Sequence, residues 1–166
     1  EDQTLKIQSD PDTKILWDVG IPNSSLIYNT ALDMIRSEEE FVGTSVQLFP
    51  DGRFLEALES AQERGVKVQA ITSRSRVFGN LPYYVINRIN AKSMLIGGSS
   101  LRVAFAPPDG VHAKYVVTPD RVEFGTNNHS RWGLRAGTAE LAISSTNPFI
   151  VEQVRAYHDR LFQASM

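Results

Sequence analysis

His112 and Lys114 stand two residues apart and are the side chains of this sequence whose types and spacing best suit chemistry. They stand at the start of the strand-like run KYVVT, Lys114 to Thr118. Side chains two apart on a strand leave the same face, so this imidazole and this ammonium can converge on one ligand. A phosphate suits such a pair.

A turn that follows the next predicted strand can contribute to the same site. It contains Gly125, Thr126, Asn127 and Asn128. Backbone N–H groups, a hydroxyl and side-chain amides in one turn can all donate hydrogen bonds to an anion. The pattern therefore predicts an anion-binding site that contains a nucleophile.

The composition limits the alternatives. With 166 residues, 42% of them hydrophobic, the chain is expected to form one domain around one core. A formal net charge of −2 gives no overall positive field and disfavours a strong nucleic-acid binder. The sequence contains no cysteine, which excludes disulfides, thiolate metal sites and cysteine nucleophiles. A cysteine-free chain suits either redox environment, so the cellular compartment is not determined. No run approaches the roughly 18 apolar residues of a membrane span.

Strand-like and helix-like segments alternate along the sequence, and these elements must position the candidate residues. Residues 1–13 predict a loose leader or a short edge strand, ahead of one domain over residues 14–166. Alternating or continuous apolar runs predict strands at 15–19, 41–49, 66–72, 101–105, 114–118, 122–126 and 140–144. Helical spacing predicts helices from Pro22–Ser24 onward, from 51 to Gly65, over about 81–95, and from Pro148 with Asn147 as N-cap. The expected fold is α/β, with a mixed sheet.

The chemical segment resembles a known family signature. H-x-K, followed by an Asp and a G-[ST]-x-N turn, is similar to the His-Lys-Asp motif of the phospholipase D superfamily. Upstream, the stretch from ALDMIRSEEEFVGTSVQLF to ERGVKVQAIT resembles the helix–strand–helix–strand lead-in of that family. Downstream, AGTAELAIS resembles its acid-bearing strand, here with Glu140, and AYHDRLFQ its closing helix. The similarity covers about residues 14–164, the extent of a single repeat. Asp120 stands six residues after Lys114, where the family pattern has five.

The resemblance implies a phospholipase D-like α/β/α sandwich, with helices on both faces of the sheet, and phosphodiesterase activity. By this resemblance, His112 attacks phosphorus and forms a covalent phosphohistidine. Catalytic roles fall to His112, Lys114, Asp120 and Glu140, and phosphate binding to Lys114, Thr126 and Asn128. Of the two acids, Glu140 is favoured for orienting the imidazole, because the motif Asp usually has a structural role in its turn. No metal or cofactor is implied.

The family mechanism uses two histidines, and this sequence carries one motif. The resemblance therefore implies a second motif, either from a homodimer partner or from the missing half of a longer parent chain. A phospholipid and a nucleic acid both remain candidates for the phosphodiester substrate, and both hydrolysis and transfer remain open. The alternative is a catalytically silent domain used for dimerisation or for binding lipid or nucleic acid.

Other polar and aromatic residues near the motif are weaker candidates. His129 directly follows the turn, where it is expected to face solvent as a loop residue or to reach the rim of the site. Arg74, Arg76 and Trp132 are further rim candidates. The alternative for the two arginines is a solubilising loop, and the alternative for Trp132 is a packing role. His158 lies among charged residues of the last helix and is expected on a solvated face.

Overall fold

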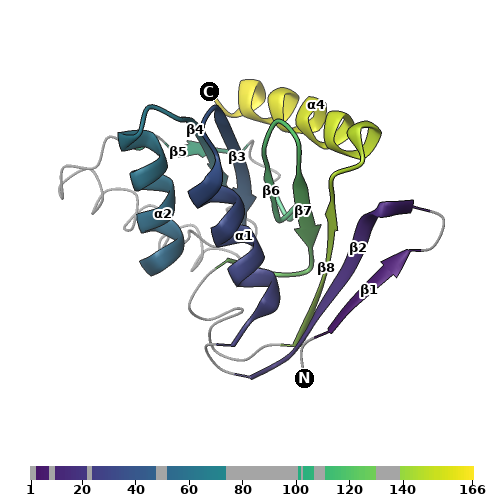
Figure 1. Cartoon of the computed structure of the whole chain (residues 1–166). Helices are drawn as coiled ribbons and strands as arrows, with labels where there is room; N and C mark the ends of the chain where they lie inside the picture. Colours follow the sequence, from purple (N-terminus) through teal and green to yellow (C-terminus); the bar gives the residue numbers. More distant parts are fainter. Residues whose placement is uncertain are drawn as a thin grey trace, which may run out of the picture.

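The computed structural model describes residues 3–7, 10–21, 24–47, 52–73, 101, 103–106, 111–129 and 139–166, and these form a mixed sheet with helices on both faces (Figure 1). This architecture confirms the predicted α/β class. The eight described strands lie in the order β1-β2-β8-β7-β6-β3-β4-β5. Only the pairs β3–β4 and β4–β5 are parallel among them. Their bounds are β1 Gln3–Ile7, β2 Asp10–Val19, β3 Phe41–Val46, β4 Lys67–Thr72, β5 Val103–Phe105, β6 Tyr115–Val117, β7 Val122–Gly125 and β8 Ala139–Ser145.

Two helices, α1 (Leu26–Ser37) and α2 (Gly52–Glu63), cover one face of the sheet. The hydroxyl of Ser25 caps α1 by accepting from the Tyr28 backbone N–H at 2.9 Å, so the helix begins slightly later than expected. Apolar residues at helical spacing on both helices pack on alternate residues of the strands, among them Val42 and Val116. This layer is the main core.

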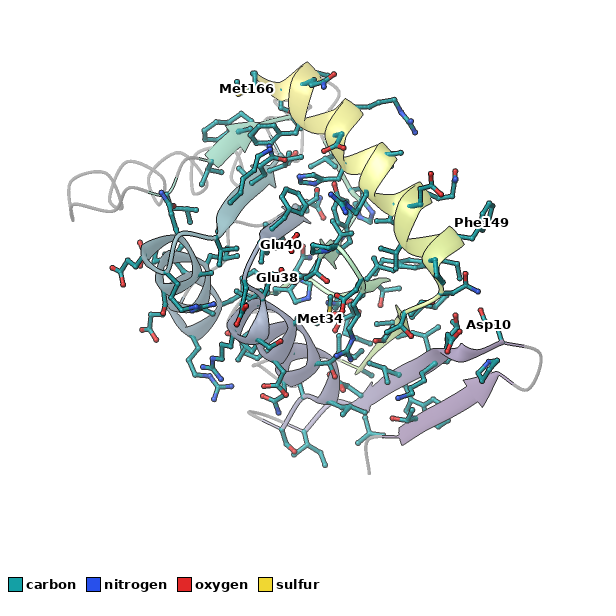
Figure 2. All side chains as sticks on the ribbon, turned by 45° about the horizontal axis from the view of Figure 1, so that its top comes forward. Asp10, Met34, Glu38, Glu40, Phe149 and Met166 are labelled. Atoms are coloured by element: carbon teal, nitrogen blue, oxygen red, sulfur yellow. The ribbon has the colours of Figure 1, made fainter. Side chains whose placement is uncertain are left out.

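The other face of the sheet is covered by α4 (Pro148–Ser165), the yellow helix of Figure 1. As predicted, Asn147 caps it, accepting from the Phe149 backbone N–H at 3.0 Å, and Pro148 occupies the first turn. Figure 2 shows Phe149 on the outer side of this first turn, where it is 69% exposed. No helix in the described part of the chain is long and apolar enough to cross a membrane.

At the N-terminal side, β1 pairs antiparallel with β2 and forms one edge of the sheet. The neighbouring strand β2 begins at Asp10, so position 13 lies inside a strand that pairs with β8. At its start, Asp10 accepts hydrogen bonds from the Thr13 hydroxyl and the Asn147 amide, at 2.7 and 3.1 Å. The bond from Asn147 joins β2 to the N-terminal end of α4. The helix expected over residues 81–95 lies outside the described residues.

The expectation that His158 lies on a solvated face is wrong. His158 is fully buried between α4 and the sheet. Its Nδ1 accepts from the Tyr115 hydroxyl at 2.9 Å, and its Nε2 donates to Gln69 Oε1 at 3.1 Å, which satisfies both nitrogens of a neutral imidazole. A Cβ on Gly43 would lie only 2.8 Å from His158 Nε2, so the glycine makes room for the ring. The buried face of α4 therefore includes position 158, whereas the neighbouring Tyr157 is 41% exposed.

The burial of His158 predicts acid sensitivity. Burial lowers its pKa to about 4 from an ordinary value of 6.5. The unfolded chain then binds the proton first as the pH falls, so stability present above pH 6.5 is lost between 6.5 and 4. We expect the free energy of unfolding to drop by about 3 kcal/mol from this group between pH 7 and pH 4.

Urea unfolding of wild type and His158→Gln at both pH values measures this loss. Glutamine keeps a donor and an acceptor but does not titrate, so the variant is expected to lose about 3 kcal/mol less than wild type on acidification. Equal acid losses in the two proteins would contradict a neutral buried His158.

Candidate active site

His112 and Lys114 lie just before β6, at the edge of the sheet where β3, β4 and β7 end and β8 begins (the lower edge in Figure 1). The Lys114 ammonium lies 3.3 Å from each ring nitrogen of His112 and donates to the His112 carbonyl at 2.7 Å. The two side chains therefore do meet, although the strand that was expected to carry them begins only at Tyr115. The imidazole is exposed, whereas Lys114 is only 4% exposed.

The surroundings of Lys114 give the site a buried cation. Burial lowers the pKa of Lys114 below its ordinary value, and the nearby carboxylate of Glu140 partly opposes this shift. A buried ammonium that is incompletely compensated gains from a second anion. The position therefore favours the binding of an anionic group beside His112.

The turn after β7 brings Thr126 to the same edge. Its hydroxyl donates to the Glu140 carboxylate, and its backbone N–H donates to the Leu141 carbonyl at 3.0 Å. Gly125 N–H donates to the Lys114 carbonyl at 3.1 Å, which ties the turn to the strand that carries the cation. A Cβ on Gly125 would lie 2.2 Å from the Leu141 carbonyl oxygen, so this close approach requires glycine. Lys114, Thr126 and Glu140 are thereby held together.

Asn128 lies two residues after Thr126 in this turn and is half-buried, with its Oδ1 buried. Between them, Asn127 is fully buried and points inward, with its Nδ2 2.9 Å from His129 Nε2. The side chain of Asn127 is thus interior, whereas those of Thr126 and Asn128 are exposed and half-buried. Asn128 remains a candidate phosphate ligand, and Asn127 has a different role.

Asp120 does not join this group. It lies in the turn between β6 and β7, at the other end of the hairpin from His112, and accepts from the Thr118 hydroxyl at 2.9 Å. Glu140 forms no hydrogen bond with His112 within the described ranges, but it is the acid bound to Thr126. A second acid at this edge, Asp18, sits opposite Glu140 in the β2–β8 pairing. Its carboxylate is occupied by the Ser25 hydroxyl and by the first N–H groups of α1.

The expectation for His129 is corrected: it is neither on the rim nor in solvent but fully buried. Its ring stacks on Phe54 of α2, with centroids 4.7 Å apart. It also contacts Glu123, a fully buried acid on β7 that sequence reasoning did not select. An acidic residue within the apolar run of a predicted strand was the available signal. Arg74, Arg76 and Trp132 lie outside the described residues.

A known family and several solved structures match this chain. Residues 31–162 match the family described as "Cardiolipin synthase, PLD-like domain". No curated protein sequence matches the chain. Solved structures with a similar fold include Nuc from Salmonella typhimurium, a phospholipase D family member, with 18% identity, a TM-score of 0.71, and coverage of 93% of this chain and 95% of that one.

Two further structures share the fold. NucT from Helicobacter pylori has 18% identity and a TM-score of 0.62, covering 83% of this chain and 88% of that one. Phosphatidylserine synthase from Haemophilus influenzae Rd KW20 has 16% identity and a TM-score of 0.68, covering 93% of this chain but 40% of that one. At these identities the structures establish a common fold, and substrate has to be argued from the site.

Proposed function

We propose that this chain, which belongs to the phospholipase D superfamily as a PLD-like domain, is a phosphodiesterase. It cleaves its substrate through a phosphohistidine on His112. The observation that carries the proposal is the contact between an exposed imidazole and a buried ammonium, with Thr126 and Glu140 alongside. An exposed imidazole can approach phosphorus, and the buried cation is preorganised to stabilise the charge of its nonbridging oxygens. Asn128 and Thr126 are the further candidate ligands for these oxygens.

The reaction proceeds in two displacements. A ring nitrogen of neutral His112 bonds to phosphorus as the bond to the leaving oxygen breaks, and a protonated second imidazole gives its proton to that oxygen. Water, or another alcohol, then attacks phosphorus, the P–N bond breaks, and the second imidazole takes the proton of the nucleophile. Glu140 is the candidate for orienting the imidazole, while Asp120 is assigned to holding the β6–β7 turn.

The second imidazole has to come from another copy of the motif. The chain has three histidines, and His129 and His158 are both fully buried, the latter on the opposite face of the sheet. Neither can meet a substrate bound at His112. A homodimer partner, or the other half of a longer parent chain, is therefore the proposed source.

The proposal predicts metal-independent hydrolysis. Because a histidine and a lysine supply the nucleophile and the positive charge, cleavage is expected to continue in EDTA. We would offer the protein single-stranded DNA, RNA and phosphatidylcholine vesicles, each with and without EDTA, and follow product release. The arm that reacts identifies the substrate class.

The outcomes of this panel are separable. Activity that EDTA abolishes and that a divalent ion restores would contradict the histidine mechanism. Binding of one substrate without cleavage in any arm would favour the silent-domain alternative.

Assembly gives a second prediction. If two copies of His112 share one site, mixing wild-type chains with a ninefold excess of inactive His112→Ala chains should leave activity near 1% of the all-wild-type value, because only wild-type pairs carry both histidines. The measurement is initial rate after unfolding and refolding the mixture, with sedimentation to establish the dimer. A monomer whose mixed activity stays proportional to wild-type content, near 10%, would refute the shared site.

A further inference from the structure

A fully buried cluster of Glu123, Asn127 and His129 lies next to the site turn, and the proposed reaction does not use it. Glu123 stands opposite Val116 in the β6–β7 pairing, on the face of the sheet that α1 and α2 cover. His129 closes the cluster from the loop after the turn, with its ring on Phe54. An acid and an imidazole placed together in a core, beside the catalytic edge, require an explanation.

The hydrogen bonds of the cluster meet at one atom. His129 Nε2 lies 2.9 Å from Asn127 Nδ2 and 3.2 Å from Glu123 Oε1. An imidazole nitrogen carries either one proton or one lone pair, so Nε2 makes only one of these two bonds fully. If Glu123 is the protonated acid, its hydroxyl donates to the Nε2 lone pair, and the Asn127 N–H donates to the Glu123 carboxyl.

Burial supports this neutral arrangement. The carboxyl of Glu123 is fully enclosed, and its Oε2 has no hydrogen-bond partner among the described residues. An ionised carboxylate would leave charge on that unpaired oxygen, whereas the acid leaves only a carbonyl. Burial also raises the pKa of Glu123, more than its hydrogen bond to His129 lowers it.

We propose that Glu123 and His129 form an uncharged hydrogen-bonded pair. The pair positions the phosphate-binding turn by holding the buried side chain of Asn127. This inference rests on the proposed function, since it assigns the turn its ligand. The turn is fixed on one side by the bonds of Thr126 to β8. On the other side, the buried Asn127 amide contacts both members of the pair, with its Nδ2 2.9 Å from His129 Nε2, so Thr126 and Asn128 flank an anchored residue. Glu123 and His129 act through Asn127 and are positioning residues.

Matched pairs of variants separate positioning from simple packing. His129→Phe keeps a ring to stack on Phe54 but has no nitrogen, whereas His129→Gln restores an acceptor. Glu123→Leu removes the donor, whereas Glu123→Gln keeps an N–H donor of the same shape without a charge. His158→Phe is the control, because it removes an equally buried histidine on the opposite face of the sheet.

Two readouts test the proposal on the full chain. We expect His129→Phe and Glu123→Leu to lower kcat by roughly 10- to 100-fold with KM changed less than about threefold, because displacement of charge donors mainly affects the transition state. The two glutamine variants should recover to within about threefold of wild type, and His158→Phe should lower Tm but not kcat. The backbone amide NMR shifts of Thr126 to Asn128 should move in the first two variants only.

The NMR readout does not depend on catalysis, so it separates this inference from the proposed function. Wild type that cleaves no phosphodiester defeats the proposed function, and the shifts still decide whether the pair positions the turn. Folded His129→Phe with unmoved shifts in the turn would overturn positioning. Glu123→Gln that is as impaired as Glu123→Leu would overturn the uncharged pair. If His129→Phe fails to fold, the two Glu123 variants decide by the same criteria.

Discussion

Replacement of His112 by alanine is expected to abolish the covalent phosphohistidine and to lower kcat on the order of 10⁴-fold or more. The imidazole is the group that bonds to phosphorus, and the other two histidines of the chain are buried away from the substrate. Rapid acid-free quenching with a ³²P-labelled diester, followed by gel separation, measures the trapped intermediate.

The side chain of His112 is exposed, so its loss should not unfold the protein. The Tm of His112→Ala is therefore expected to stay near that of wild type, which separates a chemical defect from a folding defect. An equal yield of labelled protein from wild type and His112→Ala would refute the assignment of the nucleophile.

Replacement of Lys114 by alanine is expected to lower kcat on the order of 10²-fold or more while leaving the intermediate detectable. Lys114 supplies a buried positive charge and makes no covalent bond, so phosphohistidine should still form, but slowly. Single-turnover kinetics of intermediate formation measure this difference from His112→Ala. Lys14→Ala, which removes an exposed lysine on β2, is the matched control and should retain wild-type rates.

The pH profile gives an independent check on Lys114. Because burial lowers its pKa, the free enzyme should lose this charge, and kcat/KM should fall, at a lower pH than an ordinary lysine would allow. Arginine stays protonated across this range, so the alkaline fall should be absent from whatever activity Lys114→Arg retains. The same alkaline limb in both proteins would mean that another group titrates.

Much of the fold follows from local patterns, because local patterns report backbone periodicity. The apolar runs that predict β3, β4 and β8 and the cap formed by Asn147 and Pro148 are properties of a few consecutive residues, and the structure contains these strands and this cap. The contact between His112 and Lys114 is also local, because the two residues are only two positions apart, although both precede β6. Sequence could therefore place the imidazole beside the ammonium before any tertiary contact was known.

Contacts between distant segments decided the rest. Sequence could not tell that His158 packs against Gly43, or that His129 stacks on Phe54, because each pair is joined only when a helix is laid on the sheet. For that reason His158 was expected in solvent and His129 either in solvent or on the rim of the site, and Glu123 was not selected at all. The separation of Asp120 from Glu140 likewise depends on the antiparallel pairing of β7 with β8, which places the first half of β8 beside Gly125 and its end beside Val122. Sequence alone determined the family signature and its two central residues, whereas burial, and with it the charge state of each buried group, was decided only by the packing of both helical layers on the sheet.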